Sequence, residues 1–375
     1  MKKIGIWGWF GYRNCGDDLL LINTVEEILS CGADDLNITV FGNDDNINKL
    51  FPSGSVNTQK RSASGLIKYA FKADVLVIGP GGIFPSTNLK KLFFYLIITV
   101  IMKLRRKKIG YIGMGIGMFQ RKCDIVLLNL ISKYADVFVS RSKKYLSYSP
   151  ELNEKQFILS SDMVLSDKII SSSQPVPDSQ TVVLALANIF ESNTPEYQQC
   201  FVSEIIPFVE HIVAKGYNVN LVSFTNEKDM ELNDIVAERL RTDAVKSIPF
   251  CENPYDTFNL IKDAYVCVGM RFHSLVMALS CGIPCMSISY SDKNEDIMSR
   301  FELSDYSLRF GISKNEYFNE EIMIDSASLI KTFDRIIANY GPLKDLINKR
   351  KPDMYGVSII NRTELHKLVQ GDNNE

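Results

Sequence analysis

The chain has 375 residues, of which 46% are hydrophobic and 23% charged, so it is long enough for two globular domains with a core each. Its 42 Lys and Arg against 44 Asp and Glu give a formal net charge of -2, which argues against nucleic acid as a partner. Any anionic ligand must then be met by local charge. The eight cysteines form no CxxC pair, which predicts reduced, mostly buried thiols in a cytoplasmic protein.

The first residues, MKKIGIWGWFGY, reach glycines and tryptophans too early for the apolar region of a signal peptide. We therefore expect the mature chain to start here. Short β-branched runs then alternate with segments of helical periodicity, a pattern typical of parallel α/β units. Predicted strands span 3–8, 37–42, 74–79, 108–113, 136–140 and 156–161, then 181–188, 218–224, 264–269 and 284–290, with helices at 197–215 and 274–281.

This order predicts an α/β protein with two doubly wound Rossmann-like domains facing a cleft. We assign residues 1–170 to the N-terminal domain, the polar, proline-bearing stretch 171–180 to a linker, and 181–345 to the C-terminal domain. A C-terminal helix and tail occupy 346–375, and the final GDNNE is expected to be disordered. Ligands of such sheets bind beyond the strand carboxyl ends, so the loops after strands are the candidate sites.

Three such loops lie in the first half. GWFGYRNCGDD, residues 8–18, has three glycines and then Asp17 or Asp18 to open a helix. The second loop is IGPGGIF, residues 78–84, whose glycines allow several backbone N–H groups to point at one bound anion, although Pro80 removes one donor. In VSRSKKY, Arg141 ends a strand and Ser142 is a candidate helix cap. The alternatives are ligand-free turns and an ordinary surface arginine.

The most informative stretch is VGMRFHSLVMALSCGIP, residues 268–284. Arg271 and His273 lie between a buried strand and a small-residue helix that Gly282 closes. Residues two apart in an extended segment point the same way, and a helix start adds partial positive charge, so the pair suits an anion. Lys293, after the next strand, can add charge to the same crevice, unless it is simply solvated. The other histidines, His211 and His366, fit structural roles on helices.

One segment, KKLFFYLIITVIMKLRRKK at 90–108, is apolar between basic flanks. It is too short to span a bilayer, which needs about 20 apolar residues. Two interpretations stay open. It is either a buried crossover helix with a solvated basic end, or a helix that makes peripheral contact with the inner membrane face through the basic run 103–108.

On these residues the sequence resembles the polysaccharide pyruvyl transferase family from about residue 3 to about 310. The most specific match is GMRFHSLVMALSCGIPCMSISYSDK, similar to the family's Gly-x-Arg-hydrophobic-His signature with its later Gly-x-Pro and Tyr-x-x-Lys. Asn14, Gly16 and Asp17 match its Asn-x-Gly-Asp loop, GPGGIF its glycine loop, and Arg141 its strand-end arginine. Two departures, Pro80 for a glycine and Ser142 for an acidic residue, leave the Arg271/His273 element intact.

The resemblance implies transfer of the pyruvyl group of phosphoenolpyruvate to two hydroxyls of one sugar in a cell-surface polysaccharide precursor, such as capsule or exopolysaccharide. It also implies a fold like the glycosyltransferase B architecture, with the acceptor, a nucleotide- or lipid-linked saccharide, on the N-terminal side and phosphoenolpyruvate on the C-terminal side. Neither a cofactor nor a metal is expected. Arginine clamps carboxylate or phosphate, and histidine exchanges protons near neutral pH. Arg271 and His273 are thus the expected catalytic residues. Expected substrate contacts are Arg141, Lys293, Asn14, Gly16, Asp17, Gly81, Gly82 and Ser274.

Two other functions compete with this one. A nucleotide-sugar glycosyltransferase of similar fold would bind a nucleoside diphosphate and ignore phosphoenolpyruvate. A catalytically silent saccharide-binding scaffold would not need its histidine, so a His273→Ala chain would still support polymer modification. The sugar itself cannot be read from the residues, because acceptor loops vary on a shared fold.

Overall fold

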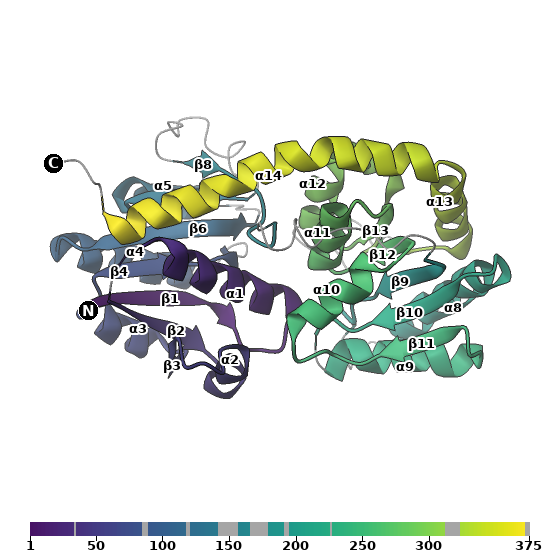
Figure 1. Ribbon diagram of the computed structural model, residues 1–375, viewed down its shortest axis with the longest axis horizontal. Coiled ribbons are helices and arrows are strands. Elements are labelled where there is room, and N and C mark those ends of the chain that lie inside the picture. The colour runs from purple at the N-terminus through teal and green to yellow at the C-terminus, as the bar shows by residue number, and fades with distance from the viewer. Residues whose placement is uncertain are drawn as a thin grey trace. The chain divides into compact units, whose positions relative to one another are not determined.

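The computed structural model describes residues 1–33, 35–84, 89–117, 121–141, 157–165, 179–190, 195–225, 227–311 and 323–371. It divides into two compact units (Figure 1). Unit 1 comprises Met1–Ser166 and Met354–Glu375, and unit 2 comprises Asp167–Asp353. The return of the C-terminal segment to unit 1 is not indicated by any pattern in the sequence. All eight cysteines are free, and five of them are buried.

Unit 1 is built on an eight-stranded sheet whose path runs β3-β2-β1-β4-β6-β7-β8, with β5 paired to β6. Every pairing recorded for this sheet is parallel. The chain therefore winds outward from β1 in both directions, which is the doubly wound arrangement. The strands are β1 (Lys2–Phe10), β2 (Leu36–Gly42), β3 (Asn57–Lys60), β4 (Val75–Ile78), β5 (Gly81–Phe84), β6 (Lys108–Ile116), β7 (Val137–Ser140) and β8 (Ile158–Leu159).

Helices cover both faces of this sheet (Figure 1). One layer consists of α3 (Ala63–Ala70), α4 (Leu89–Leu104) and α5 (Lys122–Tyr134), with α4 packed against both neighbours. Helix α1 (Cys15–Ser30) and the C-terminal part of α14 (Tyr340–Gln370) lie on the other face, and α2 (Asp44–Leu50) follows β2. The Asn14 side chain begins α1 by accepting the Gly16 N–H at 3.2 Å, which satisfies one of the helix's unpaired donors.

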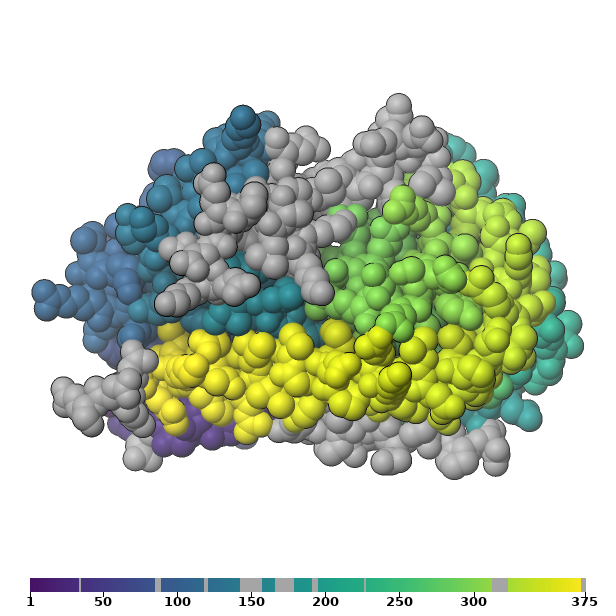
Figure 2. All heavy atoms as spheres, turned by 90° about the horizontal axis from the view of Figure 1, so that it is seen from above, coloured from purple at the N-terminus to yellow at the C-terminus, as the bar shows by residue number. Residues whose placement is uncertain are grey.

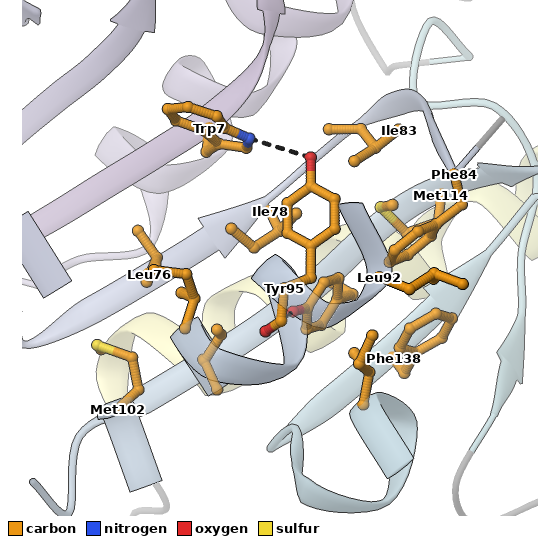
Figure 3. Packing of buried hydrophobic residues seen from close by; sticks show 14 of the residues in the cluster. Trp7, Leu76, Ile78, Ile83, Phe84, Leu92, Tyr95, Met102, Met114 and Phe138 are labelled. Carbon is orange, nitrogen blue, oxygen red and sulfur yellow. Dashed lines mark hydrogen bonds between the residues drawn. The ribbon is translucent and has the colours of Figure 1, made fainter. Parts of the chain in front are cut away.

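The core between the sheet and the α3–α5 layer is rich in aromatic rings (Figure 3). The Trp7 Nε1–H donates to the Tyr95 hydroxyl at 3.2 Å, and the hydroxyls of Thr99 and Tyr111 are hydrogen-bonded at 2.9 Å. Tyr111 also stacks on Phe138, with ring centroids 5.2 Å apart. Because each buried polar atom of these rings has a partner, the rings add apolar burial without an unsatisfied group.

The C-terminal part of α14 is held to unit 1 by hydrogen bonds from both sides. Ser358 Oγ donates to the Leu165 carbonyl at 2.8 Å, and Asn361 Nδ2 donates to the Ser161 carbonyl at 2.9 Å. His366 Nε2 lies 2.9 Å from the Glu27 carbonyl of α1, which is a structural role as the sequence predicts. Figure 2 shows this part of the yellow helix lying between the purple N-terminal residues and the blue-to-teal residues of unit 1.

Unit 2 repeats the plan with a six-stranded sheet in the order β11-β10-β9-β12-β13-β14, again parallel throughout. The order reverses between β9 and β12, which is where doubly wound sheets bind their ligands. The strands are β9 (Thr181–Ala185), β10 (Asn218–Val222), β11 (Val245–Ile248), β12 (Val266–Gly269), β13 (Cys285–Ser289) and β14 (Ser307–Arg309). The helices are α8 (Pro195–Ala214), α9 (Glu227–Leu240), α10 (Pro254–Lys262), α11 (Phe272–Cys281), α12 (Asp292–Arg300), the 3-10 turn η1 (Ser304–Tyr306) and α13 (Ser326–Ala338).

All the strands predicted from the sequence are present, with ends that differ by no more than three residues. The strands that the sequence did not indicate, β3, β5, β11 and β14, are three or four residues long, too short for an alternating pattern to stand out. The expected Ser142 cap, most of the 171–180 linker and the end of the GDNNE tail lie outside the described residues. None of the helices described here is long and apolar enough to cross a membrane.

Candidate functional site

In unit 2, Arg271 lies at the turn between β12 and α11, next to the point where the strand order reverses. The backbone N–H groups of Met270 and Arg271 both donate to the Ala185 carbonyl at the end of β9, at 3.0 and 3.2 Å. Arg271 has an extended backbone and is the residue just before α11. The turn is thus fixed between the two strands where a Rossmann-like sheet offers its crevice.

The Arg271 side chain is anchored on the buried carboxylate of Asp229, in the first turn of α9. Its Nε donates to Asp229 Oδ2 at 3.0 Å, and its Nη2 donates to Oδ1 and to the Thr225 hydroxyl, the latter at 3.1 Å. Asp229 is fully buried and also accepts the Asn188 and Thr225 N–H groups at 3.1 and 3.0 Å. One edge of the guanidinium, Nε and Nη2, is therefore used for anchoring.

The charge of this arginine is secured by its surroundings. Burial by itself disfavours the charged form, but contacts with Tyr290, which follows β13, and with the carboxylate of Asp229 outweigh it, and the pKa of Arg271 lies above its usual value. The side chain keeps 20% of its surface exposed. It is thus a permanently charged, immobilised donor at the carboxyl ends of β9, β10, β12 and β13.

His273 lies in the first turn of α11 and is half-buried, with its ring edge-to-face on Phe272 at 5.1 Å between centroids. Because the helix already begins at Phe272, the extended-segment argument for Arg271 and His273 pointing the same way is wrong, although both belong to one turn. Ser274 is buried, and its hydroxyl donates to the Arg271 carbonyl at 2.6 Å, so it holds the turn.

Lys293 lies in the first turn of α12, directly after the neighbouring junction that follows β13, and it is half-buried. The next residue, Asn294, is fully buried and donates from Nδ2 to the Met270 carbonyl at 2.8 Å. This bond ties the start of α12 to the turn that carries Arg271. The structure therefore groups Arg271, His273, Ser274 and Lys293 at one end of the unit 2 sheet.

In unit 1, the predicted loops meet at the carboxyl ends of β1 and β4. Gly81, with φ +120°, takes a conformation that side chains rarely adopt, and a Cβ placed there would lie 3.7 Å from the Asp17 carboxylate of the first loop. A Cβ at Gly115 would meet Gly82 at 3.3 Å and the Arg141 guanidinium at 3.1 Å. The two glycine-bearing loops and the arginine are therefore neighbours, and Gly82 itself is exposed.

Arg141 differs from Arg271 in how much of it a ligand could reach. It follows β7, is only 7% exposed, and forms an ion pair with Asp162, which is itself buried. Asp162 also accepts the Val164 N–H at 2.9 Å. This buried pair borders the glycine loop.

Asp18 provides the most perturbed carboxyl group of unit 1 for which a shift is resolved. Burial raises its pKa to about 7, against a hydrogen bond from the Gly11 N–H that lowers it, and the nearby charge of Asp17 raises it further. The Gly11 N–H donates to Asp18 Oδ1 at 3.2 Å. A carboxyl group in the Asn-x-Gly-Asp loop thus changes its charge near neutral pH.

Sequence reasoning missed Asp229, Tyr290 and Asp162 as parts of these sites. Asp229 lies 42 residues from the arginine that it anchors and has no motif of its own. The sequence marks Tyr290 only as the tyrosine of the Tyr-x-x-Lys match and assigns it no contact of its own. A capping role was the sole signal for Asp18. In the part of the chain that is described, no group of three or more His, Cys, Asp or Glu side chains could hold a metal ion. The expectation of a metal-free reaction stays a prediction.

The fold is that of glycosyltransferase B type enzymes and their relatives, as a comparison with solved structures shows. UDP-GlcNAc 2-epimerase from Neisseria meningitidis, bound to UDP-GlcNAc, is 10% identical with a TM-score of 0.63 over 99% of this chain and all of that one. S. aureus MnaA, solved with UDP, is 12% identical with a TM-score of 0.61 over 98% and 96%. Arabidopsis thaliana UGT89C1, complexed with UDP, is 10% identical with a TM-score of 0.57 over 98% and 100%.

The family follows from the sequence match. The family model of polysaccharide pyruvyl transferases matches residues 14–292, and this chain belongs to that family of transferases. The matched range includes the first loop from Asn14 onward, the glycine loop, Arg141 and the Arg271/His273 turn. No curated protein matches the chain.

Proposed function

We propose that the chain transfers the pyruvyl group of phosphoenolpyruvate onto two hydroxyls of one sugar in a cell-surface polysaccharide precursor. The family supports the pyruvyl transfer. The observation that carries the donor assignment is the Arg271 guanidinium, anchored on the fully buried Asp229 at the topological switch point of unit 2. A fixed cation suits a donor that carries both a carboxylate and a phosphate.

In the proposed reaction, one sugar hydroxyl attacks C2 of phosphoenolpyruvate while a proton is delivered to the methylene carbon C3. The second hydroxyl then displaces phosphate from C2, leaving a pyruvate ketal and free phosphate. His273, in the same turn as Arg271, is the proposed acid and base, because an imidazole exchanges protons near neutral pH. Arg271 would stabilise the charge that develops on the leaving phosphate, and Lys293 and the backbone turn held by Ser274 would complete the donor side.

On the acceptor side, we propose that unit 1 binds the sugar beside its first loop. Trp9, at the end of β1, is 52% exposed and stacks on Tyr12, with ring centroids 4.3 Å apart. The Arg61 guanidinium lies 5.0 Å from the Trp9 ring centroid. An exposed, rigid aromatic surface with a polar neighbour suits the apolar face of a sugar ring. Asn14, Gly16, Asp17, Gly81, Gly82 and Arg141 border this loop region and are its proposed further contacts.

The acceptor is proposed to be a saccharide linked to a nucleotide or a lipid carrier. Proteins of the same fold have been solved with UDP or UDP-GlcNAc bound, which favours a nucleotide-linked acceptor as the first to test. The protein is proposed to act in the cytoplasm, where phosphoenolpyruvate and nucleotide sugars are formed. It would need neither a metal nor a cofactor.

The donor assignment is tested by thermal unfolding with phosphoenolpyruvate, pyruvate, phosphate and UDP as separate ligands. Phosphoenolpyruvate near a hundred times its Kd should add about 2.7 kcal/mol, which raises the midpoint by several degrees. The shift should vanish in Arg271→Ala. It should persist in Arg335→Ala, a matched arginine of α13 that lies over the Tyr306 ring. A shift with UDP alone would instead identify a nucleotide-sugar transferase.

The role of His273 is tested by phosphate release in the presence of acceptor. His273→Gln should lower kcat by about a hundredfold or more while the phosphoenolpyruvate-induced shift remains, because a proton carrier is removed without the donor contact. If cells that carry His273→Ala still modify their polymer, the scaffold function holds and the catalytic assignment is wrong.

A further inference from the structure

Helix α4 presents an apolar stripe to solvent, opposite the face that it buries. Phe93, Ile97, Val100 and Leu104 recur every three or four residues and are between 41% and 80% exposed. The buried face of the same helix is a different set of residues: Leu92, Tyr95, Ile98, Thr99 and Met102. Figure 3 shows Leu92, Tyr95 and Met102 of this face within the core. A helix that is apolar on both faces needs a second apolar environment for the outer one.

The neighbouring helices extend this stripe into a surface. Among the described residues, seven of the thirteen large exposed hydrophobic side chains lie in or directly after α3, α4 and α5. Besides the four on α4, they are Phe71, Val126 and Tyr134. We call the outer side of α3, α4 and α5 the α3–α5 surface. A concentration of this kind marks an interaction site rather than scattered surface residues.

The charge on the α3–α5 surface is of one sign. Lysines are exposed on all three helices, and their one acidic residue, Asp124, is fully buried. Residues 61–134 hold thirteen Lys and Arg against two Asp, a net charge of +11, whereas the whole chain has -2, so the rest of the chain carries -13. The exposed lysines are Lys68, Lys90, Lys91, Lys103, Lys122 and Lys133.

The basic run 103–108, in the last turn of α4 and directly after it, contributes less to this surface than its sequence suggests. Lys107 and Lys103 form ion pairs with Asp74 and Asp136 at 2.7 and 2.8 Å. Arg105 donates from Nη1 to the Ala70 and Ala73 carbonyls at 2.8 and 3.0 Å. Arg106 is exposed. The run therefore chiefly holds α4 to the sheet, and the positive charge of the surface comes mainly from the helices.

We infer that the α3–α5 surface docks on an anionic lipid bilayer, with α4 lying along the interface. An apolar stripe bordered by lysines matches a membrane surface, where the side chains enter the acyl boundary and the ammonium groups reach the lipid phosphates. Helix α4 is about 24 Å long, and its inner face is committed to the core, so it lies on the bilayer and does not cross it. This inference does not depend on the proposed reaction.

Vesicle flotation tests the inference with the full chain and two lipid compositions. The protein should float with vesicles of phosphatidylcholine and phosphatidylglycerol at low salt, and much less with phosphatidylcholine alone. Lys90→Gln with Lys122→Gln should lower the partition coefficient roughly 25-fold, about fivefold for each lysine. Lys246→Gln with Lys349→Gln, which removes two exposed lysines of unit 2, should leave it unchanged.

The apolar part is tested by Ile97→Gln with Leu104→Gln, which should reduce binding at least tenfold even at low salt. The control is Leu29→Gln with Ile359→Gln, two exposed apolar residues of α1 and α14. Equal binding by the stripe variant and its control would overturn the inference. So would a wild-type protein that ignores anionic vesicles but forms a dimer that the stripe variant loses, because the occupant would then be a second copy of this chain.

Discussion

Replacing Asp18 by asparagine should stabilise unit 1 at alkaline pH. The carboxyl group is 4% exposed in the first turn of α1, and its Oδ1 accepts the Gly11 N–H. Its pKa of about 7 is raised by burial from an ordinary value of 3.8. Above about pH 4 the unfolded chain carries this group as a carboxylate, so folding must either protonate it or, above pH 7, bury it in its charged form, and both cost stability. The Asp18→Asn side chain keeps an Oδ1 acceptor for Gly11 and cannot ionise, so it avoids this cost.

The sign and the pH window follow from the raised pKa. Between about pH 4 and 7 the unfolded chain loses the Asp18 proton while the folded chain keeps it, so the stability of the wild type falls as the pH rises through this range. A shift of roughly three pKa units corresponds to about 4 kcal/mol at most. The Asp18→Asn protein should therefore match the wild type near pH 4 and exceed its stability by up to this amount at pH 8.

Tryptophan fluorescence reports selectively on the unfolding of unit 1, because the two tryptophans of the chain, Trp7 and Trp9, both belong to this unit. Urea unfolding followed by tryptophan fluorescence at pH 5 and pH 8 then reports on this unit. Asp45→Asn, at an exposed position of α2, is the matched control and should show no pH-dependent difference. If Asp18→Asn is destabilised equally at both pH values, the carboxylate is ionised in the folded protein and the reasoning is refuted.

Two further outcomes concern the sites. Asp229→Asn should lower the free energy of unfolding of unit 2 by about 3 kcal/mol, measured by calorimetry, because it leaves the Arg271 guanidinium without its buried counter-charge. The same substitution should abolish the phosphoenolpyruvate-induced thermal shift. A retained shift would show that the anchor is dispensable. Trp9→Ala should raise the KM for the saccharide acceptor about tenfold with phosphoenolpyruvate affinity unchanged, since an exposed stacking surface is lost. Phe71→Ala, which removes another exposed ring of unit 1, is the control and should leave the KM for the acceptor and the affinity for phosphoenolpyruvate unaltered. If Phe71→Ala also weakens acceptor binding, the effect of Trp9→Ala is not evidence for a specific contact with the sugar.

The turn that carries Arg271 and His273 could be predicted from the sequence because the residues that form it are neighbours in the chain. A buried β-branched run predicts β12, and the small residues after it predict α11. Gly282 ends that helix in the left-handed conformation, φ 73°, that glycine favours. Arg271 and His273 are placed by these neighbours in the chain. The same holds for the glycine loop, where Gly81 follows β4 in a conformation that a side chain would strain.

What the sequence could not reveal depends on contacts between distant residues. The sequence determined the two series of βα units, the loops that follow their strands, and the Arg271/His273 turn. Only the tertiary structure decided that Asp229 anchors Arg271, that burial moves the pKa of Asp18 to about 7, and that one face of α4 stays outside. Spacing and composition describe what a residue is, whereas burial, pairing and charge state depend on which other elements pack against it.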